Sequence, residues 1–333
     1  MLGASMKNRL DIAHGHNMDD LLLLLKNEWH TDIENLHLDS YRLGGMSNLN
    51  ILIHGADSSF VLKLPGFTTA FETNPFESEF HIALHLAENG LGPTPLCVGR
   101  LQDEKGTPFM ISAYEPGVVH ASLRNISSHE LDLVKDSLNR LAALRIPNVP
   151  SYPSAKHYAS GLSNEMNVLL DRRNTETSEL DSLLSSFREL EQGVATLFED
   201  ASSWNGTTMH GDLRPNNIVF QSDRALLLDV GACCVGDSLY DVAYLSAEPL
   251  DAVDFERKLP LLAESGDSDI ITELIPLALF SALAWTLERL VHLEDNVVEE
   301  NLSGVDVEIP LRGYFESKAK QLHMLLITAC LLS

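Results

Sequence analysis

Residues 207–243 read TTMHGDLRPNNIVFQSDRALLLDVGACCVGDSLYDVA, and this stretch carries the strongest pattern in the chain. Within it, the apolar runs IVF and ALLL flank the polar turn QSDR, which predicts a β-hairpin over residues 218–228. Asp212 and Asn217 come just before the hairpin, and Asp229 comes directly after it. The hairpin therefore brings oxygen-bearing side chains from separate segments to one end of a small scaffold.

This grouping of oxygen ligands suits phosphoryl transfer from a nucleotide. That chemistry needs a carboxylate to orient the acceptor hydroxyl, and Mg²⁺ held against the phosphates by hard oxygen ligands. We expect Asp212 to face the acceptor hydroxyl and Asn217 with Asp229 to bind the metal. Protein kinases use the same logic, with an Asp, an Asn five residues later and a metal-binding Asp before a Gly.

The residues of this motif resemble those of the aminoglycoside phosphotransferase and choline kinase family. The usual family form is close to HGDxxxxN, a metal-binding Asp and GDxxYDLA, and the matching positions here are His210, Gly211, Asp212, Pro215, Asn217, Asp229, Gly236, Asp237, Tyr240, Asp241 and Ala243. The sequence departs from the family at Val230, where Trp or Phe is common. The resemblance covers residues 35–250 and implies an α+β, bilobal, protein-kinase-like fold with a β-rich N-terminal lobe and a mainly helical C-terminal lobe.

A lysine inside an apolar strand forms a second element of the site. Lys63 lies in the predicted strand 60–64, where an inward-pointing ammonium needs a partner, although an edge strand would let it reach solvent. The following helix, predicted over 74–89, offers Glu79 and Glu77. Counted back from Leu86, the segment resembles the RExxxLxxL-like register of the family, and this resemblance favours Glu79 as the partner. Lys63 is then expected to contact the α- and β-phosphates of ATP.

Two backbone segments complete the expected nucleotide site. The loop GGMSN contains Gly45, Ser47 and Asn48 between two predicted strands, and it resembles the GGxxN loop of the family, whose N–H groups lie over phosphates. The segment AYEPG follows another strand and resembles the linker between the lobes. The backbone of Ala113 and Glu115 is therefore expected to bind adenine.

The linker also sets the expected domain boundary. We assign residues 1–115 to the nucleotide-binding lobe and 116–333 to the catalytic and substrate-binding lobe. The first 17 residues show no pattern, which is compatible with a disordered segment. Only seven positions separate Asp229 from Gly236, which leaves no room for an activation loop and favours a small alcohol as the acceptor over a protein.

The composition of the chain limits the classes of partner that we expect it to bind. The formal net charge of −25 argues against nucleic acid, and it is compatible with a cationic substrate. Trp285 and Glu288 share a predicted helix face that is able to enclose an amine, although a core Trp beside a solvated charge explains the same pattern. The longest apolar stretch, near 276–287, is too short to span a bilayer. Four cysteines without zinc spacing and the lack of a signal sequence predict a cytoplasmic protein, and the oligomeric state is not predictable.

The leading hypothesis is an ATP- and Mg²⁺-dependent kinase that phosphorylates a hydroxyl of a small molecule. Hydroxylated amines such as choline, ethanolamine and aminoglycosides are among the acceptors that the resemblance implies. The alternative is a nucleotide-binding regulatory protein without transfer activity. Degenerate kinases usually lose the lysine, the catalytic Asp or the metal-binding Asp, whereas this sequence keeps all three.

Overall fold

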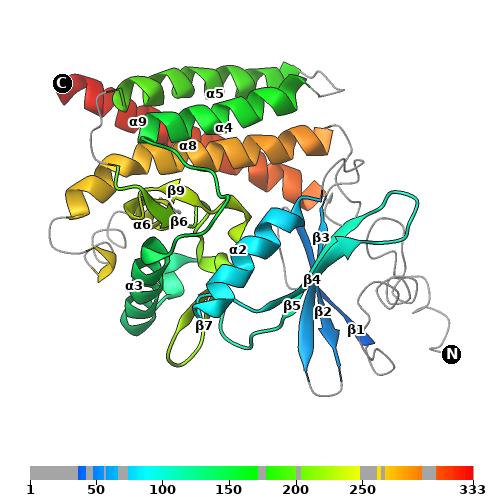
Figure 1. Cartoon of the computed structure of the whole chain (residues 1–333). Helices are drawn as coiled ribbons and strands as arrows, with labels where there is room; N and C mark the ends of the chain where they lie inside the picture. Colours follow the sequence, from blue (N-terminus) through cyan, green and yellow to red (C-terminus); the bar gives the residue numbers. More distant parts are fainter. Residues whose placement is uncertain are drawn as a thin grey trace.

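A computed structural model describes residues 37–42, 48–55, 58–66, 74–171, 178–199, 204–247, 261–263, 267–294 and 305–332 of the chain. It has two lobes: an antiparallel sheet with one helix against it, and a larger, mainly helical lobe (Figure 1). The predicted α+β, bilobal architecture is confirmed. The predicted disordered segment 1–17 lies outside the described residues.

The sheet of the smaller lobe has five strands in the order β1-β2-β3-β5-β4, and each neighbouring pair is antiparallel. One face of it packs its own small core around Ile51, Ile53, Leu62 and Phe109. Helix α2 follows β3 and contacts β4 and β5. The bounds are β1 His37–Arg42, β2 Asn48–His54, β3 Ser59–Pro65, α2 Phe76–Glu88, β4 Pro95–Arg100 and β5 Pro108–Ala113.

The larger lobe is built from helices that pack around one long apolar helix. Helix α8 contacts α4, α5, α6 and α9, and Phe280 of α8 stacks on Phe187 of α5 with ring centroids 4.8 Å apart. Helix α3 begins with a capping box in which Ser127 and Glu130 exchange hydrogen bonds with each other's backbone N–H groups. The bounds are α3 Ser128–Ala143, α4 Ala155–Asp171, α5 Ser178–Leu197, α6 Leu239–Ser246, α8 Asp267–Glu294 and α9 Val305–Leu332.

The apolar part of helix α8 is longer than the sequence indicated. The expected apolar stretch, near 276–287, was too short to cross a membrane, whereas Asp267–His292 is long and apolar enough to do so by length and composition. The most apolar window of this helix is 72% buried inside the molecule. Its apolar character is therefore explained by its place in the centre of the larger lobe.

Two short two-stranded sheets pack against helix α3 in the larger lobe. Strands β7 (Ile218–Phe220) and β8 (Ala225–Leu227) form the predicted hairpin. Strands β6 (Thr207–Met209) and β9 (Cys234–Gly236) pair across the motif, and β9 was not predicted. Both sheets are short, and almost all of their residues are buried.

The segment after β5 is fastened to the hairpin turn. Val118 and Phe220 exchange two backbone hydrogen bonds of 2.9 and 2.8 Å. Gly117 approaches the hairpin so closely that a Cβ atom there would lie 2.5 Å from Val219 Cγ1. The Gln221 side chain donates to the Glu115 carboxylate at 3.0 Å. These contacts fix the path of the chain as it passes between the lobes.

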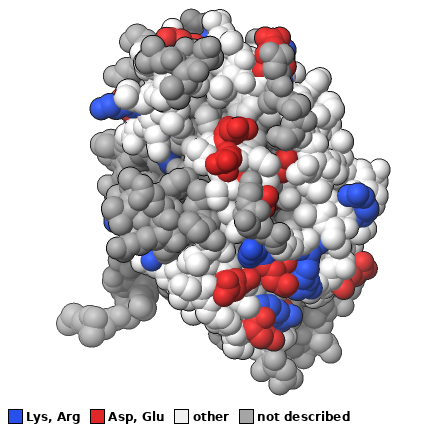
Figure 2. Space-filling view, turned by 90° about the vertical axis from the view of Figure 1, so that its left-hand side faces the viewer, with Lys and Arg blue, Asp and Glu red and all other residues white. Residues whose placement is uncertain are grey.

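One face of the molecule is shown in Figure 2. Acidic side chains gather near its centre, and acidic and basic side chains are mixed toward its lower edge. No continuous basic surface appears on this face among the residues that the structure describes. The view agrees with the net charge of −25.

Candidate active site

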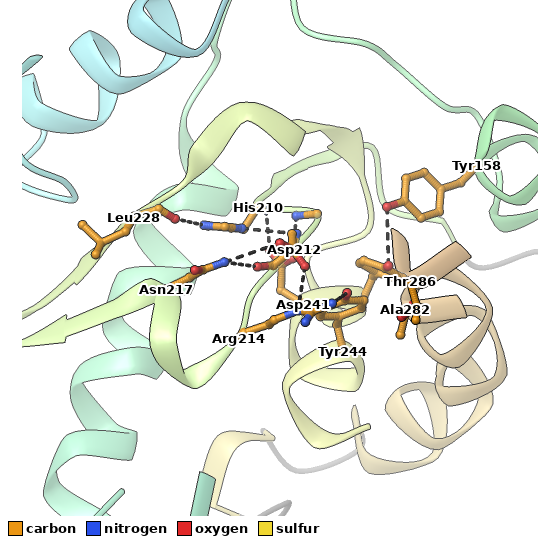
Figure 3. A network of polar contacts seen from close by, with 12 residues as sticks. Tyr158, His210, Asp212, Arg214, Asn217, Leu228, Asp241, Tyr244, Ala282 and Thr286 are labelled. Carbon is orange, nitrogen blue, oxygen red and sulfur yellow. Dashed lines mark hydrogen bonds and ion pairs between the residues drawn. The ribbon is translucent and has the colours of Figure 1, made fainter. Parts of the chain in front are cut away.

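The HGD turn is held in place from two sides. The His210 and Gly211 N–H groups donate to the buried Asp241 carboxylate at 2.6 and 2.9 Å. On the other side, His210 Nε2 lies 2.8 Å from the Leu228 carbonyl oxygen. Because a carbonyl only accepts, Nε2 carries the proton, and Nδ1 is left to accept from the Asp212 N–H at 3.3 Å. Figure 3 shows this network around Asp212.

Gly211 itself is required by the turn. Its φ is +83°, and a Cβ atom there would lie 2.4 Å from the Ala232 carbonyl oxygen. We expect Gly211→Ala to lower the free energy of unfolding by roughly 2–4 kcal/mol, because it adds steric overlap to backbone strain. Urea denaturation of the purified variant measures this change.

Gly206 provides the matched control for Gly211. Its φ is +65°, but among the described residues other than its two chain neighbours no atom lies within 4 Å of the position that a Cβ would take. Gly206→Ala is therefore expected to cost only the strain of the left-handed backbone, about 1–2 kcal/mol. Equal losses in the two variants would contradict the argument from close contact.

Lys63 links the sheet to the hairpin. Its Nζ lies 2.6 and 2.7 Å from the two carboxylate oxygens of Glu79 on α2, and 2.7 Å from Asp229 Oδ1. The predicted partnership with Glu79, in preference to Glu77, is confirmed. The contact with Asp229 was not predicted, because it joins residues 166 positions apart.

Electrostatic interactions keep the ammonium group of Lys63 charged. Burial lowers the pKa of Lys63, but attraction to Asp229 and then to Glu79 outweighs burial and leaves the pKa raised. Lys63 in turn holds the pKa of Asp229 below its usual value. The Lys63 side chain is 7% exposed and that of Asp229 is 41% exposed. Asp229 thus presents an ionised carboxylate to the space beside it.

That space is a cleft of about 330 Å³ between the sheet and the hairpin. Its walls are mainly apolar. Apolar side chains come from both lobes, namely Val61, Met110, Val219 and Leu227. The polar groups include Lys63, Glu79, Asn217 and Asp229. A cleft with apolar walls and a few convergent polar groups is typical of small-molecule sites.

Asn217 and Asp229 fit a magnesium site. The Asn217 amide nitrogen donates to the Asp212 carbonyl oxygen at 2.9 Å, so the amide oxygen points away from that contact. Asp229 uses Oδ1 for Lys63 and retains Oδ2. Among the described residues, no three His, Cys, Asp or Glu side chains form a metal-binding group. Magnesium commonly needs only one or two protein ligands, because phosphates and water supply the others.

The carboxylate of Asp212 has a partner that sequence reasoning missed. Arg214 Nε lies 3.0 Å from Asp212 Oδ1, and an Arg214 terminal nitrogen donates to the Tyr244 hydroxyl at 2.9 Å. The guanidinium carbon also lies 5.6 Å from the centroid of the Tyr244 ring. Burial raises the pKa of Tyr244, so its hydroxyl stays protonated. Tyr244 therefore fixes Arg214, which lies directly beside Asp212 (Figure 3).

Comparison with known proteins agrees with this geometry. The model of the phosphotransferase enzyme family matches residues 41–263, which include every polar group of the site described above. The chain belongs to this family. The family is named for phosphoryl transfer.

Relatives of this family member share its fold at low sequence identity. Over 242 residues it is 26% identical to mouse acyl-CoA dehydrogenase family member 10, a match that spans 70% of this chain and 22% of that protein. A choline/ethanolamine kinase family protein from Mesorhizobium loti has a TM-score of 0.60 and 16% identity, with 92% and 94% of the two chains covered.

A further solved structure is similar over almost its whole length. The choline kinase LicA from Streptococcus pneumoniae has a TM-score of 0.60 and 18% identity, with 91% of this chain and 98% of that chain covered. LicA has also been solved in complex with AMP. These structures establish the kinase-like fold of this phosphotransferase family member.

The other residues that were predicted to bind the nucleotide lie in different parts of the structure or outside its described residues. Ala113 and Glu115 line the same cleft as Lys63. Asn48 begins β2 and pairs with Pro65 of β3. Gly45 and Ser47 lie outside the described residues. The cleft thus gathers residues from the strand, the helix, the linker and the hairpin, and their roles in nucleotide binding stay predictions.

Proposed function

We propose that this phosphotransferase family member uses ATP and Mg²⁺ to phosphorylate a hydroxyl of a small molecule. The observation that carries the proposal is the meeting of Lys63, Glu79 and Asp229 in one cleft, next to Asn217 and Asp212. Each group has the chemical character that phosphoryl transfer requires. No member of this set is replaced by a side chain that would prevent the reaction.

We expect the nucleotide to lie along the cleft, from the linker to Lys63. Adenine is expected between the apolar walls, with its polar edge against the backbone of Ala113 and Glu115. The triphosphate then extends toward Lys63, which Glu79 holds and keeps charged. The expected phosphate contacts of Gly45, Ser47 and Asn48 belong to the same arrangement. The complex of LicA with AMP supports nucleotide binding in this fold.

Asn217 and Asp229 would hold Mg²⁺ at the phosphate end of the cleft. When bound, the ion neutralises charge on the phosphates and helps to align the γ-phosphoryl group. Asp229 contributes an ionised carboxylate whose low pKa is maintained by Lys63. Asn217 contributes a neutral oxygen, and its amide nitrogen ties it to the Asp212 backbone.

Asp212 would receive the acceptor. Its carboxylate orients the hydroxyl, whose oxygen forms a bond to the γ-phosphorus. The bond between that phosphorus and the β,γ-bridging oxygen breaks, and its electron pair leaves with ADP. The hydroxyl proton passes to Asp212 late in the reaction. We place the boundary between the nucleotide lobe and the acceptor lobe near Glu115.

A panel of alcohols tests the proposed function. The purified protein is incubated with Mg-ATP and single acceptors, and ³¹P NMR detects phosphorylated product. Choline, ethanolamine and aminoglycosides are included because the names of similar proteins suggest them. Nucleotide binding without transfer to any acceptor would favour a regulatory protein instead.

Lys63 provides a separate prediction about nucleotide binding. We expect Lys63→Ala to weaken Mg-ATP binding by roughly 10- to 100-fold, because a charge-assisted contact to phosphate is lost. Isothermal titration calorimetry measures the change. Lys105→Ala is the matched control, since Lys105 is an exposed lysine between β4 and β5 of the same lobe. Equal affinities of the two variants would remove Lys63 from the proposed site.

A further inference from the structure

Helix α6 carries two side chains that hold the HGD turn. Asp241 and Tyr244 are three positions apart on this helix, and residues at that spacing lie on the same face. Asp241 accepts hydrogen bonds from the His210 and Gly211 N–H groups at 2.6 and 2.9 Å. Tyr244 reaches the turn in a different way, through the side chain of Arg214 (Figure 3). One helix thus holds both the backbone of the turn and a side chain beside the proposed catalytic carboxylate.

The Arg214 guanidinium connects Tyr244 to Asp212. Its Nε atom lies 3.0 Å from Asp212 Oδ1, and a terminal nitrogen donates to the Tyr244 hydroxyl at 2.9 Å. Because the guanidinium is planar and rigid, two contacts on different nitrogens fix both its position and its tilt. Tyr244 therefore determines where the guanidinium meets the carboxylate.

Tyr244 is itself held firmly in the core of the larger lobe. It is 2% exposed, and its ring centroid lies 5.8 Å from that of Tyr240. Tyr240 in turn meets Tyr158 of α4 edge to face, with ring centroids 5.0 Å apart. Side chains in such close-packed interiors occupy defined rotamers, so the Tyr244 hydroxyl cannot move without repacking its neighbours. The contact with Arg214 is thus anchored in the core.

The two oxygens of the Asp212 carboxylate differ in their surroundings. Oδ1 faces Arg214, whereas the one contact of Oδ2 among the described residues is a long one of 3.5 Å to the Asn217 amide nitrogen. Oδ2 therefore keeps acceptor capacity for another hydroxyl. Arginine stays protonated and only donates, so Arg214 cannot take up a proton from the acceptor. Its effect is to fix the rotation of the carboxylate and to leave Oδ2 available.

We propose that Tyr244 is a positioning residue for phosphoryl transfer, which acts through Arg214 to hold the Asp212 carboxylate with Oδ2 toward the acceptor hydroxyl. The inference rests on the proposed function, because it concerns the carboxylate that receives the hydroxyl proton there. A displacement of a reacting group by about 1 Å can cost roughly 10²-fold in rate. Among the described residues, neither Tyr244 nor Arg214 lines the nucleotide cleft, so nucleotide affinity should not depend on them.

Removal of the Tyr244 hydroxyl tests the first contact. Tyr244→Phe keeps the ring and its packing but loses the hydrogen bond to Arg214. We expect kcat to fall about 3- to 10-fold, which is the size of one hydrogen bond, while KM for the acceptor and the Mg-ATP affinity stay at wild-type values. Tyr158→Phe is the matched control, because it removes another buried hydroxyl, one that lies 3.4 Å from the Tyr240 hydroxyl. It should leave kcat unchanged.

A double-mutant cycle tests whether Tyr244 acts through Arg214. Arg214→Gln should lower kcat roughly 10- to 100-fold, because a charge-assisted contact is lost. In that background Tyr244→Phe should have no further effect. Arg214→Lys should recover only part of kcat, because an ammonium group lacks the planar fork that reaches both partners. Arg188→Gln, which removes an exposed arginine on α5, should leave kcat unchanged.

A second cycle separates positioning of the carboxylate from a direct contact with the phosphates. In Asp212→Ala there is no carboxylate to orient, so Arg214→Gln should not lower the residual rate further. An equal loss in the presence and absence of Asp212 would place Arg214 on the γ-phosphate and would overturn the inference. Urea denaturation checks that each variant is folded under the assay conditions.

The outcomes distinguish this inference from the proposed function. Wild-type kcat in Tyr244→Phe, a loss that Tyr158→Phe shares, or independent losses in the cycle of Tyr244 with Arg214 would overturn the positioning role and leave the kinase function standing. A raised KM for the acceptor at constant kcat would overturn it as well. A wild-type protein that binds Mg-ATP but phosphorylates no acceptor would overturn the proposed function itself.

Discussion

Asp212→Asn is expected to lower the rate of phosphoryl transfer by roughly 10²–10⁴-fold, because positioning and general-base effects of this kind have that size. The amide keeps the shape of the carboxylate and an oxygen that can accept from Arg214 Nε. It loses the negative charge that, in the proposed mechanism, orients the hydroxyl and receives its proton. Product formation is measured by ³¹P NMR at saturating Mg-ATP with the best acceptor of the panel.

Two measurements make the Asp212→Asn result specific. Calorimetric titration with Mg-ATP should give the wild-type affinity, since Asp212 does not line the nucleotide cleft among the described residues. Asp223→Asn, at the exposed hairpin turn, should leave transfer unchanged. Near-normal transfer by Asp212→Asn would exclude it as the catalytic carboxylate.

Removal of the charge at Asp229, the proposed metal ligand, is expected to be equally severe. Asp229→Asn should lower transfer by about 10³-fold or more, because a bound metal supplies several kcal/mol of transition-state stabilisation. Asn is preferred to Ala at this position, since Asp229 has a φ of +55° and Asn tolerates the left-handed region better. Asp229→Ala should also lose activity, with an added loss of stability.

Metal dependence distinguishes this variant from Asp212→Asn. The Mg²⁺ concentration for half-maximal activity should rise in Asp229→Asn and stay constant in Asp212→Asn. Asp132→Asn, on the exposed face of α3, serves as the control for loss of one carboxylate. An unchanged Mg²⁺ requirement in Asp229→Asn would contradict the metal assignment.

Much of the site was predictable because its residues have fixed spacings. Asp212, Asn217 and Asp229 flank a short hairpin, and a hairpin has few geometries that join its ends. Glu79 was favoured over Glu77 because the segment, counted back from Leu86, resembles the register of the family.

Contacts between segments that are far apart in the sequence were harder to predict. Nothing in the sequence near Arg214 indicates that it pairs with Asp212 and Tyr244. Strand β9 was missed because Cys234–Gly236 is three residues long and has no alternation of polarity. The buried Lys318 of α9 donates to the Ala247 carbonyl at the end of α6, across 71 positions. Such pairings depend on how helices pack, which periodicity does not specify.

The position of Lys63 between Glu79 and Asp229 implies that the two proposed ligands of the cleft, Mg²⁺ and the nucleotide, bind cooperatively. A divalent ion that arrives alone must compete with the ammonium group for Asp229. Phosphates that attract Lys63 weaken its hold on Asp229 and make this carboxylate more available to the ion. By thermodynamic reciprocity, the ion then raises the affinity for the nucleotide by the same factor. We therefore expect the protein to discriminate against free metal and free nucleotide, and to take them up as one complex.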